Sequence, residues 1–197
     1  MTTLTDAQID LLSYHLRACG ATRAILAGIQ PDQWLLPTNC DMDVRALVNH
    51  LVSGHYWAAA LTQGETIVQV GARFDGDLLG SDPLAAYDAS LAAAQAAFGA
   101  EGALDRYCTL SYGEVPVSIY CSHRSLDTFI HGWDLARATR QPDTLDPELV
   151  QLTWQLFAPH AAEFAANPAF GTPLPVSADA DAQTQLLAML GRDNRRQ

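Results

Sequence analysis

Apolar residues recur at every third or fourth position along four stretches of the chain, which is the spacing of helices that bury one face. We therefore predict four long helices, over residues 6–30, 44–68, 84–98 and 117–139. Thr5 is the predicted N-cap of the first helix and Pro31 ends it, while Asp82-Pro83 is a typical start for the third. Four such helices predict an all-α fold, a helical bundle.

Shorter elements fill the rest of the chain. Residues 107–111 read as a short extended piece, a fifth helix starts at Asp146-Pro147 and reaches about residue 165, and a last one covers 180–190. We expect residues 1–166 to form the bundle domain. Residues 167–197 are expected to form a tail that packs on the bundle, because its apolar residues, among them Phe170, Leu174, Val176, Leu186, Leu187 and Leu190, would otherwise be exposed.

Composition fits one helical domain. The chain has 197 residues, of which 32 are Ala and 26 are Leu, residue types that lose little side-chain freedom in a helix. All 11 basic residues are Arg, so chemistry that depends on a lysine, such as a Schiff base, is excluded. A formal net charge of -11 argues against nucleic acid as a partner.

The cysteines and the apolar runs bear on the cellular compartment. The four cysteines form no C-x-x-C pair, the amino terminus lacks a signal-peptide pattern, and no run reaches the length of a membrane span. We expect a cytoplasmic protein with reduced thiols and no membrane partner. The Ala-rich third helix, with Tyr56, Trp57 and Tyr87 placed at the surface, suggests a contact patch for a homodimer.

Histidine and carboxylate positions point to chemistry inside the bundle. Asp127 and His131 are four residues apart and share one helix face with apolar neighbours, where unpaired polar groups are costly. His50 lies on the packing stripe of the second helix. Together the three could supply N and O ligands to a metal, with open coordination positions as in catalytic sites. Alternatively, Asp127 and His131 merely pair with each other.

The other histidines fit this site less well. His55 lies about 140° around the helix from His50, which suggests a surface or supporting role. His123 is a rival ligand, because it continues a ladder with Asp127 and His131 at intervals of four residues. His15 and His160 show no partner in the sequence and are interpreted as structural.

Two runs of sequence resemble a known family. Residues 40–54 read CDMDVRALVNHLVSG and residues 127–139 read DTFIHGWDLARAT, while the closing segment contains FGTP, VSADA and LLAMLGR. These runs resemble the actinobacterial metal-binding family related to the N-terminal domain of mycothiol-dependent maleylpyruvate isomerase, within the DinB-like four-helix bundles. The resemblance implies a divalent metal ion, zinc or nickel, held by His50, Asp127 and His131.

Three functions follow from these observations. The first is a metal-dependent transferase or isomerase that acts on a small-molecule substrate with a low-molecular-weight thiol such as mycothiol. His123, His55 and Glu114 are the residues available as general base for such an enzyme. The second is a non-catalytic module that binds metal or senses metal or thiol status. The third is a plain helical oligomer in which Asp127 and His131 merely pair and no metal is needed. Three protein ligands argue against a closed structural zinc site, which normally has four.

Overall fold

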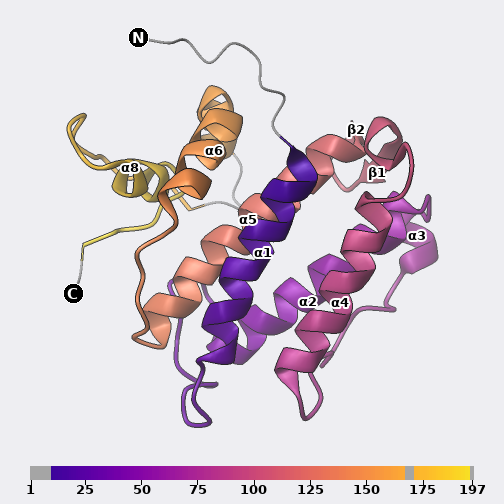
Figure 1. Ribbon diagram of the computed structural model, residues 1–197, viewed down its shortest axis with the longest axis horizontal. Helices are drawn as coiled ribbons and strands as arrows, with labels where there is room; N and C mark the ends of the chain where they lie inside the picture. Colours follow the sequence, from indigo (N-terminus) through magenta and orange to yellow (C-terminus); the bar gives the residue numbers. More distant parts are fainter. Residues whose placement is uncertain (1–9, 167–170, 196–197) are drawn as a thin grey trace.

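A computed structural model describes residues 10–166 and 171–195 of the chain. Four long helices form a bundle (Figure 1), and they are α1 (Leu11–Ala27), α2 (Val44–Thr62), α4 (Pro83–Phe98) and α5 (Val117–Ala138). Helix α1 packs against α5 and α4, and α2 packs against α4 and α5. The predicted all-α bundle is confirmed.

Aspartate side chains start three of these helices. Asp10 accepts hydrogen bonds from the backbone N–H groups of Leu12 and Ser13, and Asp43 and Asp82 cap α2 and α4 in the same way. These caps satisfy donors that the first turn of a helix leaves free. Thr5, the predicted cap of the first helix, lies outside the described residues.

The second predicted helix is shorter than expected. We predicted one helix over 44–68, but α2 ends at Thr62 and a separate short helix, α3 (Ile67–Val70), follows it. Gly64 adopts a left-handed backbone with φ of 96°, which a continuing helix does not allow. Thr66 then opens α3 with a capping box to Gln69.

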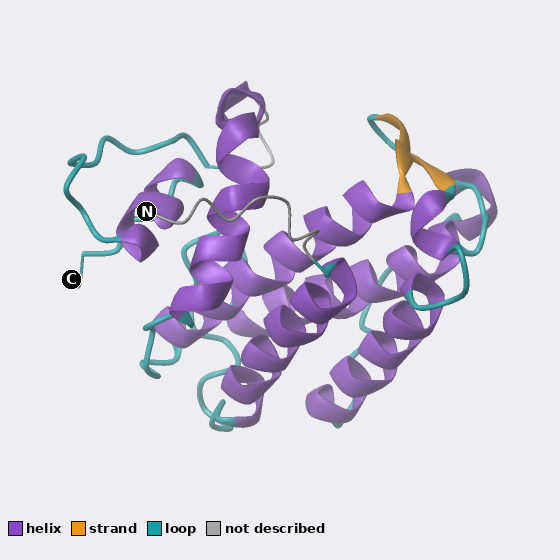
Figure 2. Cartoon of the chain, turned by 45° about the horizontal axis from the view of Figure 1, so that its top comes forward, coloured by secondary structure: helices purple, strands orange, loops and turns teal. Residues whose placement is uncertain are grey.

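The extended segment at 107–111 pairs into a hairpin that the sequence only half indicated. After a 3-10 turn, η1 (Ala103–Asp105), strand β1 (Tyr107–Leu110) pairs antiparallel with β2 (Gly113–Pro116). The second strand was not predicted, since its four residues show no apolar alternation of their own. The hairpin lies at the opposite end of the molecule from α8 (Figure 2).

The fifth predicted helix is interrupted. It divides into α6 (Pro147–Phe157), the 3-10 turn η2 (Ala158–His160) and α7 (Ala161–Ala166). Pro159 explains the break, because it lacks the N–H that a continuous helix would use.

The last helix, α8 (Ala182–Met189), packs against α6. Leu186, Leu187 and Leu190 are buried in one apolar cluster with Tyr14 and Trp133 of the bundle. The extended part of the tail is less covered, since Leu174 and Val176 are more than one-third exposed. Phe170 lies outside the described residues.

Two residues that the sequence analysis placed at or near the surface are buried. Tyr87 is fully buried, and its hydroxyl donates a hydrogen bond to the backbone oxygen of Cys19 at 3.1 Å. His55 is fully buried as well. Tyr56 and Trp57 are half-buried against Phe74. The surface patch proposed for a homodimer therefore loses Tyr87.

Over the described ranges, no helix combines the length and the apolar character that crossing a membrane requires.

Candidate metal centre

Helices α2 and α5 bring together the three residues that the sequence singled out. His50 projects from α2, and Asp127 and His131 project from consecutive turns of α5. The Nε2 atom of His50 lies 3.3 Å from Oδ2 of Asp127, and Nε2 of His131 lies 3.6 Å from Oδ1 of the same carboxylate. The rings of His50 and His131 meet edge to face, with centroids 5.3 Å apart.

The site opens to solvent on one side. The exposed fraction of the side chain is 40% for His50, 24% for Asp127 and 11% for His131. His50 therefore stands at the mouth, and His131 lies at the floor.

These separations fit ligands around a metal ion, although His50 also lies within hydrogen-bond distance of Asp127, with 3.5 Å between Nε2 and Oδ1. Around an ion with metal–donor distances of ~2.0–2.1 Å, two donors at the tetrahedral angle lie about 3.3 Å apart. The three donors lie within 4.8 Å of one another, and carboxylate oxygens of Asp127 lie 3.3 Å from Nε2 of His50 and 3.6 Å from Nε2 of His131. The distance from His131 to Asp127 is too long for a good hydrogen bond. In addition, Oδ2 of Asp127 is buried without an aligned donor in the described part of the chain.

A second carboxylate fixes the orientation of His131. Nδ1 of His131 donates a hydrogen bond to Oδ2 of Asp134 at 2.9 Å, and Asp134 is fully buried. With its proton on Nδ1, the neutral ring presents the lone pair of Nε2 to the side where Asp127 lies. A carboxylate behind a histidine in this way is the usual support of a metal-ligating imidazole. Without a metal, both ring nitrogens of His131 face carboxylates. Burial alone would lower the pKa of His131, but Asp127 and Asp134 outweigh it and raise that pKa to about 10.

A buried arginine lies beneath Asp127. NH2 of Arg124 is 3.1 Å from Oδ2 of Asp127, an ion pair without the alignment of a hydrogen bond. The guanidinium rests on Gly54 of α2, where an added Cβ would lie only 2.0 Å from NH2. Burial alone would raise the pKa of the Asp127 carboxyl, but Arg124 and the imidazoles of His131 and His50 outweigh it and hold that pKa well below its ordinary range.

The thiol of Cys40 approaches the same histidine from the loop before α2. Its sulfur, a nitrogen of His131 and an oxygen of Asp134 also lie within 4.8 Å of one another. Asp134 is already held by His131 and by Arg192, whose NH2 is 3.1 Å from Oδ2. Cys40 is therefore a neighbour of the donor set on the side of Asp134.

The rival residues point elsewhere. Nδ1 of His123 is 2.9 Å from the hydroxyl of Tyr112, and His123 belongs to neither set of close donors found among the described residues. Glu114 is exposed on β2 and also lies outside both sets. His160 lies at the surface, 3.1 Å from Glu163.

Two further histidines form a buried layer below the site. Nδ1 of His55 lies 3.1 Å from the hydroxyl of Ser90, and Nδ1 of His15 lies 3.1 Å from that of Ser125. Burial, and next the positive charge of Arg124, lowers the pKa of His15 to about 4 and holds that of His55 well below its ordinary value. Both rings are neutral at physiological pH. The suggested surface role of His55 was wrong, because its angle around α2 points it toward α1 and α4 rather than toward solvent.

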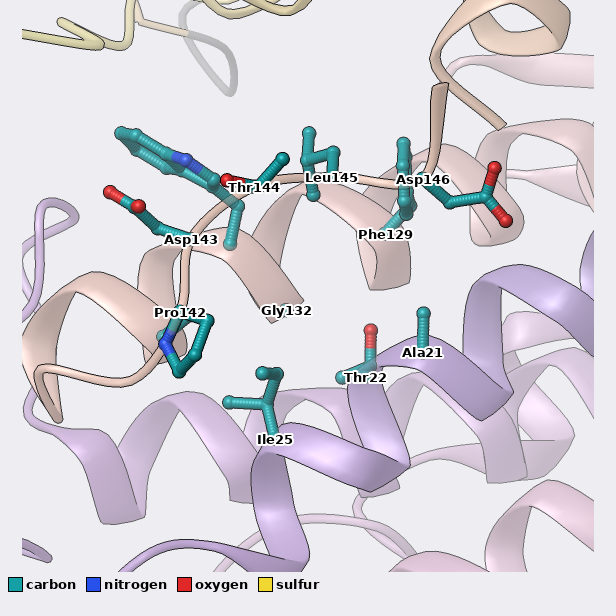
Figure 3. A pocket seen from close by; sticks show the side chains of 12 residues that line it. Ala21, Thr22, Ile25, Phe129, Gly132, Pro142, Asp143, Thr144, Leu145 and Asp146 are labelled. Atoms are coloured by element: carbon teal, nitrogen blue, oxygen red, sulfur yellow. The ribbon is translucent and has the colours of Figure 1, made fainter. Parts of the chain in front are cut away.

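A separate, partly open pocket with a volume of about 100 Å³ lies between α1, α5 and the segment that leads into α6 (Figure 3). Its walls are mostly apolar, and they are formed by Ala21, Thr22, Ile25, Phe129, Gly132, Trp133, Ala136, Pro142, Asp143, Thr144, Leu145 and Asp146. None of the donor residues lines it, so it is not part of the candidate metal centre.

Comparison with known sequences assigns the chain to a family. The sequence profile of the mycothiol maleylpyruvate isomerase N-terminal domain matches residues 15–136. The chain belongs to this family. The match to the mycothiol maleylpyruvate isomerase N-terminal domain contains His50, Asp127, His131, Asp134 and Arg124, and it ends before the tail.

Two relatives of the chain come from Mycobacterium tuberculosis, strains CDC 1551 / Oshkosh and ATCC 25618 / H37Rv, and each is described only as an uncharacterized protein. Each is 36% identical over 146 residues, which cover 72% of this chain and 74% of the relative. No solved structure matches the chain.

Sequence reasoning missed three residues around the donors. Asp134 and Arg124 lie on α5 three residues from His131 and from Asp127, so helical spacing could have suggested both. Arg192 carries no such signal, because it is 58 residues from its partner Asp134.

Proposed function

We propose that this chain binds one divalent metal ion at His50, Asp127 and His131 and uses it to bind a low-molecular-weight thiol as a thiolate, as a metal-dependent thiol transferase or isomerase. The observation that carries the proposal is the spacing of the three donors, which matches ligands around an ion and leaves a side open to solvent. The family description, which names mycothiol and maleylpyruvate isomerase, supports the thiol and the reaction class.

The chain's own residues would do most of the positioning. His50 and His131 would bind through Nε2, Asp127 would bind through a carboxylate oxygen, and Asp134 would keep His131 in the correct tautomer. A bound divalent ion supplies a positive charge that lowers the pKa of a thiol in contact with it. The apolar pocket that Thr22 helps to line takes no part in the proposed binding of metal and thiol.

Charge in the site favours an anionic ligand. With neutral imidazoles, the carboxylate of Asp127 and the guanidinium of Arg124 cancel each other, and Asp134 and Arg192 do the same. The two positive charges of the ion are then not offset by the protein. A thiolate is attracted more strongly than a neutral thiol in such a site.

Cobalt substitution tests the proposal. In protein loaded with Co²⁺, addition of mycothiol, glutathione or cysteine should produce a thiolate-to-metal charge-transfer band in the near ultraviolet. The test uses a variant with Cys40, Cys108 and Cys121 replaced by Ser, so that the band cannot come from these three thiols, and a His131→Ala variant as the negative control. Absence of a new band with every thiol would contradict the thiol-binding function.

A thiol-binding module without turnover is the second candidate. It is favoured by the positions of His123, His55 and Glu114, since none of these general bases joins the donor set in the described ranges. An assay of thiol-dependent isomerisation of maleylpyruvate separates the two functions. Turnover supports the enzyme, and thiol binding without turnover supports the module.

A further inference from the structure

The segment after α8 reaches the candidate metal centre from outside the family-matched region. It follows a tight turn at the end of α8, where Gly191 has a φ of 76°. The N–H of Arg192 donates to the oxygen of Leu187 at 2.8 Å, and the N–H of Gly191 donates to that of Ala188 at 3.1 Å. This pair of bonds is a Schellman motif, which sets the direction of the chain after the helix.

A close contact between the backbones of Gly191 and Gly171 also requires glycine at the turn. A Cβ on Gly191 would lie 2.6 Å from backbone atoms of Gly171, so the two backbones approach each other more closely than a side chain permits. The turn therefore needs Gly191 for its left-handed backbone and for this approach. Since Leu186, Leu187 and Leu190 of the same segment are buried against the bundle, this turn directs Arg192 toward α5.

The side chain of Arg192 is held at both ends of its guanidinium. NH1 donates to the oxygen of Leu190 at 2.7 Å, and NH2 donates to Oδ2 of Asp134 at 3.1 Å. Its side chain is 12% exposed, and that of Asp134 is not exposed at all. Salt and solvent screen such a contact far less than they screen a surface ion pair.

One oxygen of Asp134 thus serves two partners. It accepts from Arg192 on one side and from Nδ1 of His131 on the other. Because a carboxylate oxygen only accepts, the bond to Asp134 places the proton of a neutral His131 ring on Nδ1, and Arg192 holds that oxygen in position. The lone pair of Nε2 is then presented on the side of Asp127.

We propose that Arg192 is a positioning residue for the metal centre, acting through Asp134 on His131, so that the C-terminal segment completes the support of a site built by the bundle. This inference rests on the proposed metal function. It assigns a role to a residue outside the matched range of 15–136. It also explains why a buried carboxylate in the bundle has its cationic partner in the tail.

Zinc affinity, measured by competition with a chromogenic chelator, tests the proposal. Arg192→Gln should weaken zinc binding by about 10–100-fold, the usual effect of losing an outer partner of a ligand, and Asp134→Asn should weaken it at least as much. The double variant should bind no more weakly than Asp134→Asn alone, because Arg192 acts through Asp134. Arg192→Lys should restore part of the affinity.

Arg137→Gln is the matched control. Arg137 also makes a partly buried ion pair, at 2.8 Å to Asp143, and donates to the backbone oxygen of Arg195 in the tail, so its polar partners differ from those of Arg192. The Arg137→Gln substitution should leave zinc affinity unchanged, even if it lowers the melting temperature. The Co²⁺ ligand-field spectrum should change in Arg192→Gln and not in Arg137→Gln.

The outcomes distinguish a failure of the proposed role of Arg192 from a failure of the proposed metal function. Wild-type affinity in Arg192→Gln, or additive losses in the double variant, would overturn the role of Arg192 while leaving the metal function intact. A wild-type protein without zinc affinity would overturn both.

Discussion

Substitution of Gly54 by Ala should disrupt the buried pair of Arg124 and Asp127. The added Cβ would lie 2.0 Å from NH2 and 2.5 Å from Cζ of Arg124, where ordinary contact begins at 3.4 Å. The guanidinium must therefore move by more than ~1 Å in a packed interior, away from a partner that is now 3.1 Å from it.

The size of the effect follows from the burial of the pair. Separating a buried ion pair costs about 3–5 kcal/mol, and Ala in place of Gly within a helix returns about 1 kcal/mol. The free energy of unfolding should fall by about 2–4 kcal/mol, which corresponds to a decrease in melting temperature of roughly 5–15 °C for a chain of this size.

Urea and thermal unfolding in the presence of a chelator measure this change. Gly20→Ala is the control, because Gly20 is exposed on α1 and an added Cβ there meets nothing within 4 Å. It should be neutral or stabilise by up to ~1 kcal/mol. Arg124→Met should cost much less in the Gly54→Ala background than in the wild type. If Gly54→Ala is as stable as Gly20→Ala, Gly54 does not seat Arg124 and the reasoning is refuted.

Two further predictions concern packing and pH. Gly132→Ala should lower the free energy of unfolding by about 1–3 kcal/mol, measured by urea unfolding. The reason is that its Cβ would lie 2.3 Å from Oγ1 of Thr22, where α5 crosses α1. A stability equal to that of Gly20→Ala would contradict this close crossing. The unfolding free energy should also fall as pH decreases from 6.5 to about 4, because the unfolded chain protonates His15 in this range and the folded protein does not. His15 alone accounts for up to roughly 3 kcal/mol of this loss, so His15→Asn should show a weaker pH dependence between pH 7 and 4.5, and an unchanged dependence would exclude His15 as its source.

The fold could be predicted from the sequence where local signals agreed. Apolar periodicity and start signals placed α1, α2, α4 and α5, and the errors arose where the cause was conformational or non-local. Gly64 ends α2 with a left-handed backbone inside an otherwise apolar pattern. The depth of His55 and Tyr87 depends on how α1, α2 and α4 pack together, which spacing along one helix does not encode.

The site could be predicted in part for the same reason. Asp127 and His131 share a face of one helix, so their proximity follows from helical geometry. His50 joined them in our prediction through its position on the stripe of α2 and through the family resemblance. Arg192 could not be found in this way, since its contact with Asp134 depends on the docking of α8 and on the turn at Gly191.

The metal content of the protein tests the central claim most directly. After dialysis against zinc and removal of loosely bound ions, elemental analysis should find about one zinc per wild-type chain near pH 7.5. His50→Ala and His131→Ala should lose it, because two protein ligands do not hold the ion, whereas His123→Ala should retain it. Zinc that persists in both His50→Ala and His131→Ala, or that disappears only in His123→Ala, would contradict the assignment.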